Sequence, residues 1–165
     1  MSFQLALLDF PNTEQLMNSI KKQFEEIDGR VILSMEDIMD RLNSFSFPDV
    51  DLVVGITSGA AFPAKKIASL LNLPVRYIHI NFRLPDNTPK YENPQLIEME
   101  NIPSHYHRVL LVDDVSVTGK TLRCAVENLQ NFTVHTFVLK GKADYVLFPE
   151  INTCIDWPWN SGISE

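Results

Sequence analysis

Two runs of apolar, mostly β-branched residues constrain the fold of this chain more than any other feature of its sequence. They cover residues 50–57 (VDLVVGIT) and 108–114 (RVLLVDD), and the second run ends in two carboxylates. Apolar runs of this kind are typical of strands buried on both faces of a parallel sheet. Helical and β-rich segments follow them in alternation, at residues 60–71, 75–80, 119–130 and 133–140. This alternation predicts an α/β fold with a doubly wound parallel sheet, in which ligands bind at the carboxyl ends of the strands.

The N-terminal part of the chain and one internal segment lie outside this alternation. Residues 3–10 predict a short strand, and a helix is expected from a cap at Asn12 to Gly29. A second helix is expected to begin at Ser34. Residues 81–107 are polar, contain four of the 10 prolines and predict one long flexible loop. A loop of this length inside a compact domain is more often functional than not.

The composition argues against several classes of partner. The chain has 14 Lys and Arg against 21 Asp and Glu, a net charge of −7, and no long basic run, so we expect no nucleic-acid partner. Cys124 and Cys154 lack metal-site spacing and are expected to be reduced thiols. The N-terminus lacks a basic n-region, and no apolar run approaches the roughly 20 residues that span a bilayer. We therefore expect a cytoplasmic protein without a membrane partner.

Residues 109–121 carry the strongest chemical signal in the sequence. An apolar strand ends in the adjacent carboxylates Asp113 and Asp114, and a turn with hydroxyls and a glycine then opens a helix. Adjacent carboxylates can accept hydrogen bonds from a ribose diol, and backbone amides at a helix N-terminus can bind a phosphate. The combination predicts a ribose 5-phosphate site. A Walker A loop is excluded, since Asp114 stands where that motif needs a glycine, five residues before Gly119. The alternative is an ordinary strand–turn–helix whose acids cap the helix.

This segment resembles the signature of the type I phosphoribosyltransferases that binds phosphoribosyl pyrophosphate (PRPP). The resemblance implies that Asp113 and Asp114 are the catalytic acids, binding the ribose hydroxyls and a Mg²⁺ cofactor directly or through water. It also implies a site for PRPP and its 5′-phosphate formed by Ser116, Val117, Thr118, Gly119, Lys120 and Thr121.

Two further stretches extend the resemblance to about residues 34–162. Residues 55–64 are similar to the family's pyrophosphate loop, which implies pyrophosphate binding by Thr57, Ser58, Gly59 and Ala60. The family often has Arg or Lys in place of Ser58, so a cation would have to come from elsewhere, such as Lys65 or Arg83. Residues 144–162 resemble the tail of bacterial xanthine–guanine phosphoribosyltransferases, which implies base contacts by Lys140, Cys154 and Ile155. We accordingly expect one domain over residues 1–165, with an N-terminal extension (1–33), the flexible loop (81–107) and a small C-terminal hood segment (141–165).

Two positions depart from the 6-oxopurine enzymes at the base site. Val117 replaces an Asp that is proposed to handle the purine N7 proton, and Cys154 replaces the aromatic residue that stacks on the purine. Trp157 or Trp159 could supply an aromatic surface instead. The resemblance implies transfer of a 5-phosphoribosyl group from PRPP to xanthine, guanine or hypoxanthine, as in purine salvage, with release of pyrophosphate. The alternatives are a non-catalytic PRPP- or nucleotide-binding regulator and a transferase for another nitrogen base. By analogy, the protein is expected to form a homo-oligomer.

Overall fold

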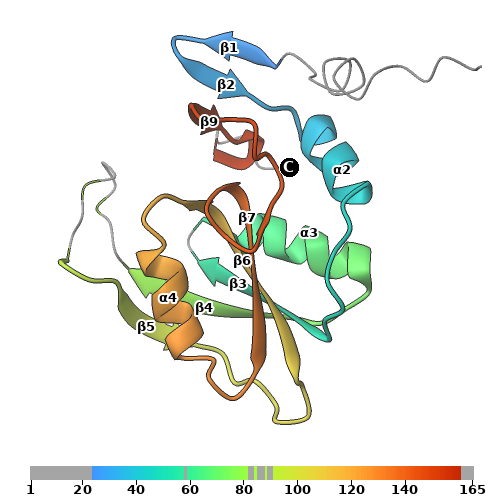
Figure 1. Cartoon of the computed structure of the whole chain (residues 1–165), viewed down its shortest axis with the longest axis vertical. Coiled ribbons are helices and arrows are strands. Elements are labelled where there is room, and N and C mark those ends of the chain that lie inside the picture. Colours follow the sequence, from blue (N-terminus) through green and yellow to red (C-terminus); the bar gives the residue numbers. More distant parts are fainter. Residues whose placement is uncertain (1–23, 58, 82–83, 85–87, 89–90, 161–165) are drawn as a thin grey trace, which may run out of the picture.

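The computed structural model describes residues 24–57, 59–81, 84, 88 and 91–160 (Figure 1). The predicted strand at residues 3–10, most of the helix expected from Asn12, and the predicted site residues Ser58 and Arg83 lie outside the described residues. No helix in the described part of the chain is long and apolar enough to cross a membrane.

The described residues form a main sheet in which six strands lie in the order β5-β4-β3-β6-β7-β8. All neighbouring strands are parallel except β5 and β4. The strands are β3 (Leu52–Thr57), β4 (Val75–Asn81), β5 (Gln95–Met99), β6 (Arg108–Ser116), β7 (Thr133–Gly141) and β8 (Tyr145–Val146). The predicted α/β class and the mostly parallel sheet are confirmed.

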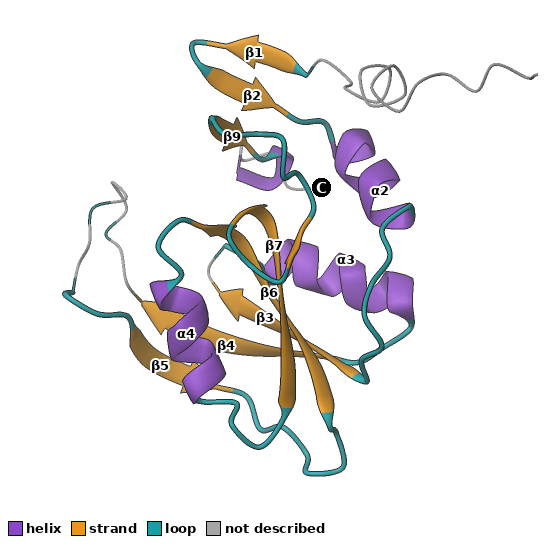
Figure 2. Cartoon of the chain, in the orientation of Figure 1, coloured by secondary structure: helices purple, strands orange, loops and turns teal. Residues whose placement is uncertain are grey.

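Helices cover both faces of this sheet, as a doubly wound fold requires (Figure 2). Helix α3 (Ala61–Leu71) joins β3 to β4, and α4 (Lys120–Glu127) joins β6 to β7. Successive residues of a strand point to opposite faces, so Leu110 packs in the same core as α3, while Leu111 packs in the same core as α4. The apolar runs are continuous because both faces of β3 and β6 are buried.

The connections leave β3 and β6 in opposite directions, so their carboxyl ends form the topological switch point where ligands bind in such folds. Gly59 follows β3 and lies directly against Asp114 of β6, since a Cβ added at Gly59 would lie 2.5 Å from Oδ2 of Asp114. Glycine therefore allows the two loops of the switch point to come this close.

A second sheet lies above the carboxyl edge of the main sheet (Figure 1). Strands β1 (Glu25–Ile27) and β2 (Arg30–Ile32) form a hairpin, and β2 pairs in parallel with β9 (Cys154–Asp156), which precedes the 3-10 helix η1 (Pro158–Asn160). We call this sheet with η1 the hood. The prediction of a helix reaching Gly29 is wrong, because Asp28 and Gly29 adopt positive φ and turn the hairpin. Arg30 of β2 pairs with Cys154 of β9, 124 positions further along the chain, and this pairing makes the segment a strand. The helical periodicity of the local sequence did not reveal a distant partner.

Two other expectations are tested directly. Helix α2 (Met35–Asn43) begins as predicted, with Ser34 and Asp37 in a reciprocal capping box with two 3.1 Å hydrogen bonds. Residues 81–107 do not form a single loop, because β5 pairs antiparallel with the edge of β4. Every residue of β5 is exposed, so the strand carries no buried apolar pattern by which its sequence could have shown it.

Candidate functional site

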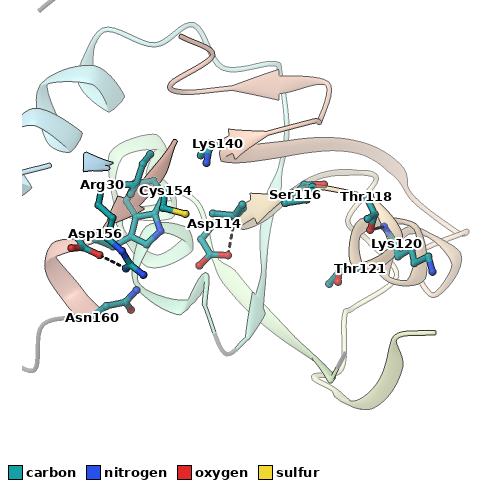
Figure 3. Close-up of a pocket in the computed structure, with 15 residues that line it drawn as sticks. Arg30, Asp114, Ser116, Thr118, Lys120, Thr121, Lys140, Cys154, Asp156 and Asn160 are labelled. Carbon is teal, nitrogen blue, oxygen red and sulfur yellow. Dashed lines mark hydrogen bonds and ion pairs between the residues drawn. The ribbon is translucent and has the colours of Figure 1, made fainter. Parts of the chain in front are cut away.

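A cavity of about 660 Å³ lies between the carboxyl edge of the main sheet and the hood (Figure 3). Its volume suits a small-molecule ligand. One end is formed by the end of β6 and the turn into α4, and the other by the end of β7 and the hood. The lining residues are Arg30, Asp114, Val115, Ser116, Val117, Thr118, Gly119, Lys120, Thr121, Lys140, Cys154, Ile155, Asp156, Trp157 and Asn160.

The two adjacent acids of β6 have different positions. Asp114 lines the cavity, and its Oδ1 accepts a 2.7 Å hydrogen bond from the N–H of Val115. Asp113 leaves the strand on the opposite face, is buried, and its Oδ1 accepts a 2.9 Å hydrogen bond from the N–H of Asp114. Burial, together with the negative charge of Asp114, raises the pKa of Asp113 well above its usual range. Of the predicted pair, Asp114 therefore lines the cavity, while Asp113 is buried and supports the end of the strand through the amide of Asp114.

The predicted phosphate turn lines the cavity in full, from Ser116 to Thr121. Gly119 has φ +78° and, as the N-cap of α4, has no side chain to cap the helix, while the hydroxyl of Thr118 accepts a 3.3 Å hydrogen bond from the amide of Lys120. The next amides of the first turn are available to an anionic ligand. The hydroxyl of Ser116 is buried and, among the described residues, has no hydrogen-bond partner. A buried hydroxyl without a partner beside a helix N-terminus favours a ligand that supplies an acceptor.

The end of β7 presses against this turn. Gly141 has φ +110°, and a Cβ added there would lie 1.9 Å from the carbonyl oxygen of Ser116. The same oxygen accepts a 2.9 Å hydrogen bond from the N–H of Lys142. Gly141 therefore sets how closely the phosphate turn approaches β7, a role that its sequence context did not indicate.

Of the predicted pyrophosphate residues, the structure describes Thr57, Gly59 and Ala60, and none of these three is among the residues that line the cavity. Thr57 donates its hydroxyl to the carbonyl of Ile78 at 3.4 Å, and Ala60 is buried as the N-cap of α3. Among the three described residues, Gly59 approaches the site most directly, since a Cβ added there would lie 2.5 Å from Oδ2 of Asp114. Lys65, a proposed cationic partner, is exposed on α3 and is not among the residues that line the cavity.

The predicted base residues Lys140, Cys154 and Ile155 all line the end of the cavity under the hood. The ammonium of Lys140 donates to the carbonyl of Thr153 at 2.5 Å. Cys154 is exposed and is not in a disulfide. Val117, at the position where the related enzymes carry an acid, is 65% exposed, so a longer polar side chain has room there.

The hood is fixed to α3 by aromatic stacking. Trp157 stacks on Trp159 with ring centroids 5.3 Å apart and planes 3° apart, and Trp159 stacks on Phe62 at 5.1 Å. Trp157 lines the cavity but is only 4% exposed. This tryptophan therefore shapes the cavity wall near the predicted base residues and does not offer a free ring face.

Three polar residues that line the cavity were not identified from the sequence: Arg30, Asp156 and Asn160. Nη1 of Arg30 forms a 2.9 Å ion pair with Oδ1 of Asp156. Arg30 reaches the cavity because β2 pairs with β9, and no local pattern signals a contact between residues 126 positions apart. Asp156 and Asn160 lie inside the recognised C-terminal stretch and could have been considered as polar residues close to the base contacts.

The carboxylate of Asp114 could bind a hard cation whose other ligands come mostly from the substrate and from water. Within the described residues no group of three or more His, Cys, Asp or Glu side chains could hold a metal ion. Magnesium is commonly bound by one or two carboxylates together with substrate phosphates and water. The carboxylate of Asp114 fits that role, and the buried Asp113 does not reach the cavity.

The sheet order and the cavity at the switch point place the chain among the α/β proteins that bind ligands at the carboxyl end of a parallel sheet. Comparison with known protein families identifies the family within this class. The phosphoribosyl transferase domain matches residues 21–161, and the chain belongs to that family. The match includes the β1–β2 hairpin, which precedes the part of the chain where the sequence showed a resemblance.

The individual proteins that resemble this chain have low sequence identity to it. The Bifunctional protein PyrR of Syntrophobacter fumaroxidans (strain DSM 10017 / MPOB) is 28% identical over 123 residues, which cover 65% of this chain and 66% of that protein, just under two thirds of its length. A hypothetical protein from Neisseria gonorrhoeae with bound ppGpp has TM-score 0.64 and 20% identity, covering 84% of this chain and 93% of that one. The xanthine-guanine-hypoxanthine phosphoribosyltransferase of Helicobacter pylori has TM-score 0.61 and 19% identity, covering 79% and 92%. These structures share the fold, and the predicted resemblance to type I phosphoribosyltransferases is confirmed.

Proposed function

We propose that this protein transfers the 5-phosphoribosyl group of PRPP to a 6-oxopurine such as xanthine, guanine or hypoxanthine and releases pyrophosphate. The observation that carries the proposal is one continuous cavity with Asp114 and the α4 N-terminus at one end and Lys140 at the other. In the reaction, the bond from C1′ to the pyrophosphate oxygen breaks and its electron pair leaves with pyrophosphate. A ring nitrogen of the base bonds to C1′, and its proton passes to solvent.

The sugar and phosphate are bound by the end that the sequence had indicated. Asp114 accepts hydrogen bonds from the ribose hydroxyls, while the amides that open α4 and the hydroxyl of Ser116 donate to the 5′-phosphate. Asp113 is a positioning residue. It accepts a hydrogen bond from the N–H of Asp114 and acts on the reaction through that residue. These contacts hold C1′ in a fixed place, which matters most for a reaction with an oxocarbenium-like transition state.

The leaving pyrophosphate and the incoming base use the rest of the site. A Mg²⁺ ion held by PRPP oxygens and Asp114 would neutralise charge that develops on pyrophosphate. Lys140 keeps N–H donors beyond the one it gives to Thr153 and can donate to the 6-oxo group. Val117 cannot accept a proton, so the base proton leaves through the exposed cavity wall at that residue.

The test is pyrophosphate release from PRPP and Mg²⁺ with a panel of purine and pyrimidine bases. We expect release with at least one 6-oxopurine, loss of release with EDTA, and severe loss in Asp114→Ala. Asp49→Ala is a matched control, because this aspartate is 80% exposed and pairs with Arg108 outside the cavity. Release with pyrimidines alone would overturn the base assignment and leave the transferase proposal standing. If none of the bases gives pyrophosphate release, both the base assignment and the transferase proposal are overturned.

A second candidate is a non-catalytic regulator that binds PRPP or a nucleotide, and Val117 favours it because the position has lost a proton acceptor. The Neisseria gonorrhoeae protein of the same fold has ppGpp bound in its structure, which supports nucleotide binding by a protein of this fold. Calorimetry with nucleotides separates the candidates. Tight binding without pyrophosphate release from any base is the result expected of a regulator.

A further inference from the structure

The base end of the cavity has few flat surfaces that a planar ring could stack on. Among the described residues, Trp157 is the aromatic side chain that lines the cavity. One of its faces is covered by Trp159, and at 4% exposure the other face is covered as well. A base could stack on Trp157 only after the hood had repacked.

Arg30 offers the accessible flat group at this end. Its side chain is 57% exposed, and its guanidinium is fixed at one edge by the 2.9 Å ion pair with Asp156. An ion pair in the plane of the guanidinium leaves the two faces of that plane free to stack. The ammonium groups of Lys140 and Lys120 also line the cavity, but an ammonium has no plane to offer.

The register of the hood places Arg30 next to an open space. Arg30 is the direct partner of Cys154 in the parallel pairing of β2 with β9, so both side chains leave the sheet on the same face. Cys154 is small and exposed, and it leaves space beside the guanidinium that a large side chain would fill. Figure 3 shows Arg30 grouped with Cys154 and Asp156, at the far end of the cavity from Thr118 and Lys120.

We propose that the guanidinium of Arg30, held by Asp156, is the surface on which the base stacks, with Cys154 leaving the space that the ring occupies. The inference rests on the proposed function, because it assigns a specificity-determining residue to the same base site. Guanidinium groups stack on heteroaromatic rings with added cation–π attraction. The site then favours a flat purine, which overlaps the guanidinium over a larger area than a saturated ring could.

The test compares ligands that differ only by the base. Calorimetry of the full chain measures ribose 5-phosphate and the monophosphates GMP, XMP, IMP and UMP, and the tightest monophosphate is kept. Arg30→Ala should weaken that monophosphate about tenfold and leave ribose 5-phosphate within about twofold. Arg30→Lys keeps the charge without the plane and should recover little. Full recovery with lysine, equal losses for both ligands, or no monophosphate tighter than ribose 5-phosphate would each overturn the proposal.

A rescue and a matched control complete the experiment. Cys154→Trp in the Arg30→Ala background supplies a new flat surface at the paired position and should restore most of the monophosphate affinity. Arg108→Ala removes an arginine of similar exposure from an ion pair with Asp49 outside the cavity, and should change neither ligand. A rescue that fails in a variant with unchanged thermal unfolding counts against the proposal. Binding results are independent of pyrophosphate release, so failure here is distinguishable from failure of the proposed transfer reaction.

Discussion

The two ends of the cavity are built in different ways. The end proposed to bind the sugar phosphate is one continuous segment, from Asp114 to Thr121, that a single strand–turn–helix carries. The end proposed to bind the base combines Arg30 from β2, Lys140 from β7, and residues 154–157 and 160 of the hood. A segment that is local in sequence keeps its geometry through its own turn and helix cap, whereas an assembled site depends on how distant strands pair. The base end can therefore change its chemistry while the phosphate end stays the same.

The largest expected effect is a loss of stability at Gly141, where the end of β7 meets the turn after β6. Gly141→Ala should lower the free energy of unfolding by about 3 kcal/mol or more, because its Cβ would overlap the carbonyl oxygen of Ser116 at a positive φ. Urea denaturation measures this change. Gly29→Ala is the control, since Gly29 has φ +76° but nothing within 4 Å of an added Cβ, and it should cost only about 1 kcal/mol. Equal costs for the two variants would show that Gly141 does not set the spacing of the ends.

The next largest effect is on ligand affinity, and comparing ligands with and without a base separates the two ends of the cavity. Asp114→Ala should weaken ribose 5-phosphate and nucleoside monophosphates about 10- to 100-fold, because each loses hydrogen bonds to a charged group. The ratio of the two affinities should stay constant, as measured by calorimetry. A change in that ratio would mean that Asp114 also contacts the base.

Lys140→Ala should act on the other end alone. We expect GMP to bind about tenfold more weakly, with ribose 5-phosphate unchanged, because one charged hydrogen bond to the 6-oxo group is lost. Lys142→Ala is the matched control, being exposed two residues further on and absent from the cavity wall. Equal losses in both lysine variants would indicate a general loss of positive charge rather than a contact.

The smallest expected effect is a gain in stability at the phosphate end. Asp113 has its pKa raised by burial and by Asp114, so above its unfolded pKa the folded state binds more protons than the unfolded state. The free energy of unfolding then falls as pH rises through the interval between the two pKa values. Asp113→Asn keeps an acceptor for the amide of Asp114 but cannot ionise. Its advantage over the native protein should therefore grow as pH rises above the unfolded pKa of Asp, about 3.9, and level off above the raised pKa of Asp113 in the folded state.

Denaturation curves at several pH values measure this difference. Asp114→Asn serves as a second variant, because removing its charge should lower the pKa of Asp113 and flatten the pH dependence. Parallel pH profiles for the native protein and Asp113→Asn would show that Asp113 ionises as easily in the folded chain as in the unfolded one.

The sequence by itself determined the parts of this protein whose signals are local. The apolar runs at β3 and β6 predicted buried parallel strands, Ser34 predicted the start of α2, and residues 116–121 predicted a turn that now lines the cavity. Each follows from neighbours in the chain: side-chain periodicity, a helix cap, or a glycine at positive φ.

The tertiary structure decided everything that depends on pairing between distant segments. It turned residues 25–32 into a hairpin against β9, added β5 to the edge of β4, and brought Arg30 beside Cys154. It also separated Asp113 from Asp114, because the orientation of β6 sends one acid into the core and the other into the cavity. The hydrogen bonds and cross-strand side-chain contacts of a pair of strands can join segments at any distance in the sequence, so no short window of residues reveals them.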